Sequence, residues 1–190
     1  MSRTNPPLPR EPGAGTPAMP AADRTAWVSA ELLGPVVTGD KIRKEMEQAV
    51  QRYPNPRSAI LPVLWILQRE IGWLPPAALQ LAARAVGLPE PEVFGIATFY
   101  TMFNLKPVGR HHLQVCMTLS CSLMGADRLF RHLERKLGIG HGETTPDGRF
   151  TLRRVECLAA CGGGPCMQVN FDYRENVDET QVDRLLETLK

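Results

Sequence analysis

Between residues 39 and 106, apolar residues recur every three or four positions, which is the period of amphipathic helices. In the first of these helices Ile42, Met46 and Val50 share one face. Four helices are predicted, and they begin at Asp40, at Asn55-Pro56, at Pro75-Pro76 and at Pro91. Asp and Asn can accept hydrogen bonds from the first free backbone N–H groups, and proline is tolerated at the first helical position. The short connections between the helices predict a helical bundle over residues 39–106.

The ends of the last two helices are also marked in the sequence. Gly87 is expected to close the third helix in the left-handed conformation, and Pro89 just beyond it cannot continue a helix. The fourth helix is expected to run to about Phe103 and to bury Val93, Ile96, Ala97 and Tyr100.

After residue 106 the hydrophobic period changes from helical to alternating, and this change predicts a second domain over residues 107–190. Strands are predicted around Leu113–Met117, over 150–156 and from Met167 to Phe171. Helices are predicted over 122–137 and after Asp178, which with Gln181 has the spacing of a capping box. The order strand, helix, strand, strand, helix indicates a small mixed α/β layer, of which the thioredoxin-like arrangement is one member. The predicted fold class is therefore α+β, a helical bundle followed by an α/β domain.

Residues 1–38 have a different composition, with seven prolines among small and polar residues. Such a segment buries too little apolar surface to offset its ordering entropy, so we predict a tail that is disordered by itself. The only apolar patch in it surrounds Trp27, which either clips the tail onto a partner or has no role.

Composition and charge exclude several classes of protein. The chain has 190 residues, of which 43% are hydrophobic and 22% charged, so it can build a core without disulfides. A net charge of +2 is too small to indicate a nucleic-acid partner. No apolar run is long enough to span a bilayer, and no secretory signal is apparent, so we expect a reducing, cytoplasmic setting and no direct membrane insertion.

Four of the five cysteines form two local pairs, each at the end of a strand-like segment. Cys116 and Cys121 are separated by four residues, and Cys157 and Cys161 by three. Structural zinc usually closes on cysteines with two residues between them, whereas the larger [2Fe-2S] core suits wider pairs. The spacing favours an iron–sulfur centre, and leaves structural zinc and thiol redox or disulfide chemistry open.

Other residues near these pairs bear on the same centre. Cys121 is expected to lie one residue before a helix, where backbone N–H groups favour a thiolate. Three glycines follow Cys161 and would let the backbone approach an inorganic core closely. Cys166 is predicted to be a packed or spare thiol, because four ligands are complete without it. His111 and His112 point to opposite faces of a strand and cannot both bind one metal.

Several segments closely resemble the 24 kDa subunit family of respiratory complex I, the NADH-quinone oxidoreductase. In the cysteine-containing half they are HLQVCMTLSC (112–121), VECLAAC (155–161) and GPCMQVN (164–170). In the helical half they are GWL (72–74) and PEVFGIATFY (91–100). The resemblance covers about residues 40–190 and departs from the family at Gly163-Gly164, where members commonly carry bulkier residues.

The resemblance implies a thioredoxin-like [2Fe-2S] ferredoxin domain whose ligand positions fall on Cys116, Cys121, Cys157 and Cys161. It implies an electron-transfer subunit with no acid–base or nucleophilic residue of its own, which exchanges single electrons with a partner. That partner would be a flavoprotein subunit that holds FMN and NADH, joined by other peripheral-arm subunits at the inner face of the cell membrane. Within the family, a diaphorase subunit of a soluble NAD-dependent formate dehydrogenase or NAD-reducing hydrogenase is the alternative. A zinc-stabilised interaction module is the alternative from another class.

Overall fold

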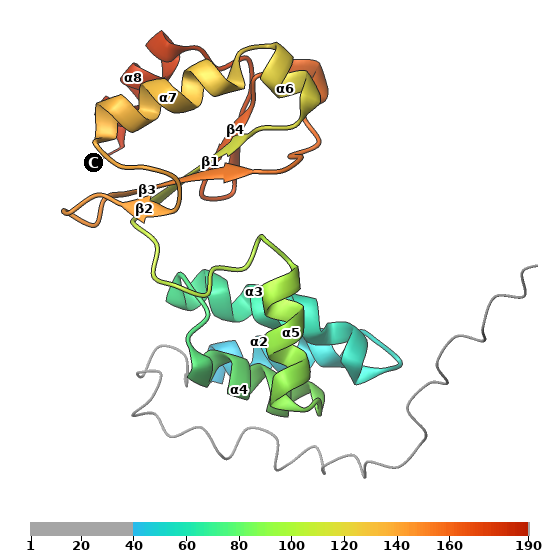
Figure 1. Cartoon of the computed structure of the whole chain (residues 1–190). Coiled ribbons are helices and arrows are strands. Elements are labelled where there is room, and N and C mark those ends of the chain that lie inside the picture. The colour runs from blue at the N-terminus through green and yellow to red at the C-terminus, as the bar shows by residue number, and fades with distance from the viewer. Residues whose placement is uncertain (1–39, 190) are drawn as a thin grey trace, which may run out of the picture.

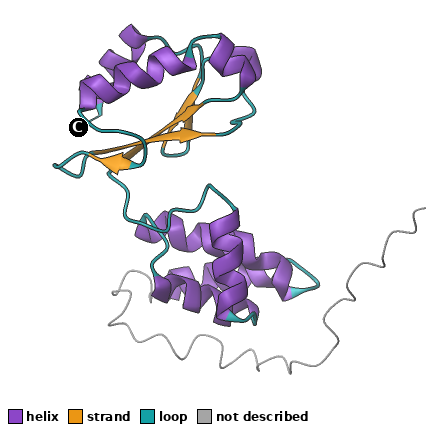
Figure 2. Cartoon of the chain, in the orientation of Figure 1, coloured by secondary structure: helices purple, strands orange, loops and turns teal. Residues whose placement is uncertain are grey.

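The structure, a computed structural model, describes residues 40–189 (Figure 1). The predicted tail over residues 1–38, with its Trp27 patch, lies outside the described residues. The chain continues as a group of helices and then as a sheet covered by helices, which is the predicted α+β class (Figure 2). The boundary between residues 106 and 107 remains our proposal for dividing these two halves, which we call the helical half and the sheet half.

The helical half contains four α-helices and one short 3-10 helix. They are α2 (Asp40–Gln51), η2 (Pro56–Ala59), α3 (Ile60–Ile71), α4 (Pro76–Val86) and α5 (Glu90–Phe99). Asn55 caps η2, since its side chain accepts a hydrogen bond from the N–H of Arg57 at 3.0 Å. Gly87 ends α4 with φ of 71°, in the left-handed conformation that was predicted for it. At these two positions the structure follows the capping residues of the sequence, although Pro56 begins a 3-10 helix and the α-helix begins only at Ile60.

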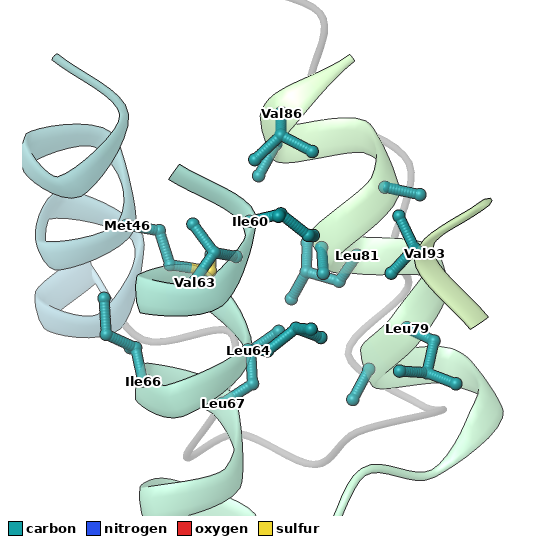
Figure 3. Packing of buried hydrophobic residues seen from close by; sticks show 14 of the residues in the cluster. Met46, Ile60, Val63, Leu64, Ile66, Leu67, Leu79, Leu81, Val86 and Val93 are labelled. Carbon is teal, nitrogen blue, oxygen red and sulfur yellow. The ribbon is translucent and has the colours of Figure 1, made fainter. Parts of the chain in front are cut away.

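The core of the helical half lies between α2, α3, α4 and α5. Val63, Leu64 and Leu67 of α3 are fully buried. Val63 lies beside Met46 of α2, on the other side of α3 from Leu81 and Val93 (Figure 3). The buried positions of α3 repeat at three and four residues, as the sequence pattern requires for helix-on-helix packing.

The fourth helix is shorter than predicted. It ends at Phe99, and Tyr100 is in an extended conformation with φ of −85° and ψ of 107°. Tyr100 is therefore exposed where burial was expected, and Phe103 is buried instead because the chain turns back onto the bundle. Gln68 holds this turn, since its side chain donates to the Met102 carbonyl at 2.9 Å and accepts from the N–H of Asn104 at 2.6 Å.

The sheet half contains five strands in the order β2-β3-β1-β4-β5. The strands are β1 (His111–Cys116), β2 (Glu143–Thr144), β3 (Phe150–Val155), β4 (Met167–Val169) and β5 (Asp172–Arg174). β1 pairs with β3 in parallel and with β4 in antiparallel orientation. Between and after the strands lie α6 (Leu119–Leu123), α7 (Ala126–Leu137), η3 (Cys161–Gly163) and α8 (Glu179–Thr188), of which α7 and α8 lie side by side over the sheet (Figure 1).

The sequence predicted one helix over 122–137, and the structure has two in this region. Thr118, in an extended conformation, starts α6, and Gly125 with φ of 102° separates α6 from α7. Glycine alone adopts this φ without steric cost, so the helical period continues on both sides of a real break. Phe171 was expected in a strand, but it lies in the turn between β4 and β5 and is exposed.

The capping box before the last helix is present as predicted. The Asp178 carboxylate accepts from the N–H of Gln181 at 2.7 Å, and the Gln181 side chain accepts from the N–H of Asp178 at 3.0 Å. Val182 and Leu186 of α8 are buried against the sheet half's core. None of the helices over residues 40–189 combines the length and the apolar character needed to cross a bilayer.

Candidate metal centre

Both cysteine loops begin at the same end of the sheet, where the strands β1 and β3 finish. Cys116 is the last residue of β1, and it pairs with Val155, the last residue of the parallel strand β3. Parallel strands end at the same side of a sheet, so Cys157, two residues beyond β3, begins its loop next to the Cys116 loop. The N–H of Leu158 in the second loop also donates to the sulfur of Cys116 in the first. The parallel pair therefore makes the two loops converge.

The structure brings three thiols together at this end of the sheet. The sulfur atoms of Cys116, Cys121 and Cys166 all lie within 4.8 Å of one another, and all three residues are buried. Cys166 directly precedes β4, which pairs with β1, and the N–H of Cys116 donates to the Cys166 carbonyl at 3.1 Å. The sequence predicted a spare or packed thiol here, and Cys166 is fully buried. Its contact with the other two thiols was not predicted, and it follows from the pairing of Val115 with Met167 next to Cys116 and Cys166.

Cys121 was expected to lie just before a helix, but it lies inside the five-residue helix α6. The reason is the early helix start at Thr118. The field of a long helix N-terminus therefore does not act on this sulfur. What surrounds Cys121 instead is the buried contact with Cys116 and Cys166.

Cys157 and Cys161 are exposed and lie on the adjoining loop. The N–H of Ala159 donates to the Cys157 sulfur at 3.2 Å, and Ala159 has the rare φ of 58°. A cavity of about 750 Å³ between α3 and the sheet reaches Cys157 and Leu158. The second pair is therefore open to solvent in a segment whose conformation points backbone N–H groups at sulfur.

Of the three glycines after Cys161, Gly163 has a steric role. A Cβ atom at Gly163 would collide with the side chain of Glu175, and one at Gly164 would lie 3.7 Å from the Cys121 sulfur. Gly163 is buried, so no larger residue fits there without moving Glu175. The absence of a side chain at 163 thus matches the packing of this chain, whereas a Cβ atom at 164 would make only an ordinary van der Waals contact.

The buried thiols differ in how readily they ionise. Burial pushes the pKa of Cys116 upward, but hydrogen bonds from the N–H groups of Thr118 and Leu158 outweigh burial and leave the pKa below its usual value. Burial raises the pKa of Cys121. Burial also raises the pKa of Cys166, to about 12, and the neighbouring Cys121 sulfur adds to the effect. Cys116 is therefore the thiol best prepared to bind metal, and Cys166 the one most firmly held as S–H.

His111 and His112 are the first two residues of β1. His112 is buried, whereas His111 is partly exposed. Burial lowers the pKa of His112 to about 4, with a smaller contribution from Arg153. Its Nε2 has no hydrogen-bond partner among residues 40–189. The two histidines thus have different environments, and the clustered metal-ligand types within the described residues are the three cysteines alone.

The donor set fits a [2Fe-2S] core, which takes two protein sulfurs on each iron. Two thiols of the first loop are buried together, and two more lie exposed on the neighbouring loop, outside the buried group of sulfurs. Thiolate sulfur without carboxylate or imidazole in the cluster also suits iron–sulfur chemistry or zinc rather than a hard cation.

Comparison with known proteins identifies the family. The sequence pattern of the thioredoxin-like [2Fe-2S] ferredoxins matches residues 46–190. The chain belongs to this family of thioredoxin-like [2Fe-2S] ferredoxins. The expected [2Fe-2S] cofactor is thereby confirmed, and buried cysteines cluster where the two loops converge.

The relatives of this ferredoxin confirm the resemblance to the complex I family. The E 2 subunit of the NADH-quinone oxidoreductase of Rhizobium meliloti is 50% identical over 149 residues, which cover 78% of this chain and 89% of the relative. NADH-quinone oxidoreductase subunit 2 of Thermus thermophilus is 44% identical over 76% of this chain and 82% of its own length. These relatives are subunits of an oxidoreductase complex.

Among solved structures, the ferredoxin resembles an NAD+-reducing [NiFe]-hydrogenase in the H2-reduced state. The TM-score is 0.59 at 24% identity, and the match covers 67% of this chain but 22% of the hydrogenase chain. At this identity the likeness is one of fold. It extends beyond the sheet half, since the share of this chain that it covers exceeds the sheet half's length.

Proposed function

We propose that this chain is the [2Fe-2S] electron-transfer subunit of an NADH-quinone oxidoreductase. The observation that carries the proposal is the 50% identity to the Rhizobium meliloti relative over 149 residues, nearly the whole length of that relative. The bound cluster supplies one-electron chemistry, so no general acid, base or nucleophile is required of this chain. The similarity to the hydrogenase is one of fold. A subunit of an NAD+-reducing hydrogenase is therefore the less favoured alternative.

The proposed ligands are Cys116, Cys121, Cys157 and Cys161. The support is the convergence of their two loops at the ends of β1 and β3, together with the buried contact of the first pair. In the chain itself, the N–H groups of Thr118 and Leu158 stabilise negative charge on Cys116, which would favour the thiolate form that metal binding needs. The N–H of Ala159 donates a hydrogen bond to the Cys157 sulfur.

The proposed partner is a flavoprotein subunit that holds FMN and oxidises NADH, with other peripheral-arm subunits around it. Through this complex the chain would lie in the cytoplasm, peripheral to the inner face of the cell membrane. The helical half is our candidate for the docking surface, and Phe94 and Phe99 of α5 offer exposed aromatic area there. The residues Leu119, Leu123 and Met124 around α6 offer a competing surface beside the cysteines.

The first test concerns the metal. The full chain, purified without oxygen, is expected to contain about two irons, to absorb visible light and to give an EPR signal after reduction by dithionite. Alanine variants of each of the four proposed ligands should lose the iron. A colourless chain with one zinc and no iron would overturn the proposal in favour of an interaction module.

The second test concerns the partner. With the flavoprotein present, NADH should reduce the cluster, and without it NADH should not. Phe99→Ser on the helical half and Leu123→Ser beside the cysteines form a matched pair of exposed apolar-to-polar changes. Weaker co-purification of Phe99→Ser alone supports docking through the helical half, whereas weaker co-purification of Leu123→Ser alone contradicts it. Recovery of hydrogenase or formate dehydrogenase subunits with the chain would support the alternative complex.

A further inference from the structure

A fifth thiol lies against the proposed cluster ligands, and neither the family pattern nor the proposed function gives it a role. The Cys166 sulfur is 3.6 Å from the Cys121 sulfur, and the residue is fully buried, with 0% of its surface exposed. Its sulfur also lies within 4.8 Å of the Cys116 sulfur. Cys166 therefore contacts both ligands of the first pair.

The backbone holds Cys166 in this place from both sides. The N–H of Cys116 donates to the Cys166 carbonyl at 3.1 Å, and the N–H of Val177 donates to the carbonyl of the preceding Pro165 at 3.0 Å. The next residue, Met167, is fully buried and pairs with Val115 of β1. Because the neighbouring backbone is bonded into the sheet and the residue is fully buried, the Cys166 side chain is held next to Cys121.

A buried thiol at this distance can donate a hydrogen bond to a thiolate sulfur. The S–H group is a weak donor, and a metal-bound thiolate sulfur is a charged acceptor, which strengthens a hydrogen bond. Losing a proton would leave Cys166 as an additional buried negative charge beside two others, so it remains the donor. The Cys121 sulfur carries more negative charge when the cluster is reduced than when it is oxidised. A donor to this sulfur therefore stabilises the reduced state more.

We propose that the Cys166 S–H donates a hydrogen bond to the Cys121 sulfur and thereby raises the reduction potential of the cluster. Cys166 is thus a positioning and tuning residue that acts through a ligand. The inference rests on the proposed function, because it requires Cys121 to be a cluster ligand. Two other roles make different predictions: as a ligand Cys166 would be needed for iron binding, and as a packing residue it would leave the potential unchanged.

The test compares Cys166→Ser with Cys166→Ala in the full chain. Serine and alanine have nearly the same volume, so the two variants differ chiefly in the presence of a hydroxyl donor. Both are expected to retain the cluster. In a redox titration followed by EPR, the potential of Cys166→Ala should be lower than that of Cys166→Ser and of the wild type. An exchangeable proton coupled to the reduced cluster should be detected in the wild type and the serine variant and be weakened in the alanine variant.

Each other result overturns the inference. Equal potentials in the two variants, or a higher one in Cys166→Ala, would mean that Cys166 only fills space. Loss of iron from Cys166→Ala alone would make Cys166 a ligand. If either variant fails to fold, Cys166→Thr and Cys166→Val form a second matched pair with the same expected order. A wild-type chain without iron would instead reject the proposed function, so the two failures are distinguishable.

Discussion

The helical half and the sheet half each bury one hydrophobic cluster, but they differ in the polar groups inside. The helical half buries Gln68, and both ends of its amide are hydrogen-bonded, to Met102 and Asn104. The sheet half buries three thiols that lie close together in space, and it buries His112, whose Nε2 has no hydrogen-bond partner among the described residues. An unpaired buried polar group costs stability, so it is usually retained where function requires it. From this difference we expect the helical half to be stable without a ligand and the sheet half to be stabilised by the bound cluster.

The strongest test of this difference is removal of the metal. Without it, the ligand sulfurs lose their bonding partner. Two of them, Cys116 and Cys121, are buried, and at about 1 kcal/mol for each buried group the loss destabilises the sheet half by about 2 kcal/mol or more. Hydrogen exchange of the full chain before and after chelation should show faster exchange in β1 and β3. The amides of α3 and α4 serve as the internal control and should keep their protection. An equal loss in both halves would show that they unfold as one unit.

The same comparison explains what the sequence could and could not predict. Gly87 and the Asp178 capping box act within a few residues, so the helix ends they predict agree with the structure. The break at Gly125 was missed because the helical period is the same on both sides of it. The contact of Cys166 with Cys121 was missed for another reason, since it results from the pairing of β4 with β1, which are far apart in the sequence.

The convergence of the two cysteine pairs was easier to expect, because strand-like segments precede both of them. Their different burial could not be predicted from the sequence. Cys116 and Cys121 belong to the sheet half's core, whereas Cys157 and Cys161 are exposed. Burial depends on which elements cover a loop, and that is decided by the arrangement of the whole sheet half rather than by residues near the cysteines.

A core substitution in the helical half should affect stability without affecting the centre. Leu64→Ala removes a fully buried side chain from α3 and should lower the free energy of unfolding by about 2–5 kcal/mol. Denaturant unfolding followed by far-UV circular dichroism measures this loss, and the visible spectrum of the folded variant should match the wild type. Phe94→Ala, at an exposed position of α5, is the control and should change stability by about 0.5 kcal/mol or less. Loss of iron from Leu64→Ala would contradict the independence of the two halves.

Acid should weaken the sheet half through His112. In the unfolded chain this imidazole takes up a proton near its ordinary pKa of 6.5, but in the folded chain burial lowers the pKa to about 4. Between these values the unfolded state binds more protons. The stability that neutral His112 contributes is therefore fully present above pH 6.5 and is lost as the pH falls toward 4. The full contribution is at most about 3 kcal/mol for a difference of about 2.5 pKa units.

The experiment for His112 compares the wild type with His112→Gln between about pH 7 and pH 4.5, the range in which the two protonation equilibria differ. The free energy of unfolding of the wild type should fall more steeply with acidification, because glutamine has no proton to gain on unfolding. Carboxyl groups such as Asp147 and Asp183, whose hydrogen bonds to Thr145 and His132 lower their pKa values, contribute equally to both proteins and cancel in the difference. Parallel curves for the two proteins would show that the folded state accommodates a charged His112.

The smallest expected effect concerns a feature that was predicted from sequence alone, the capping box of α8. Asp178→Ala removes the acceptor for the Gln181 N–H and should cost about 1 kcal/mol of stability. Glu187→Ala, at an exposed position near the other end of the same helix, is the matched control and should cost about 0.5 kcal/mol or less. Since α8 packs Val182 and Leu186 against the core that contains the cysteines, the loss should appear in β1 and α7 by hydrogen exchange and leave α3 unchanged. A loss shared by α3 would instead mean that the helical half depends on the sheet half for its stability.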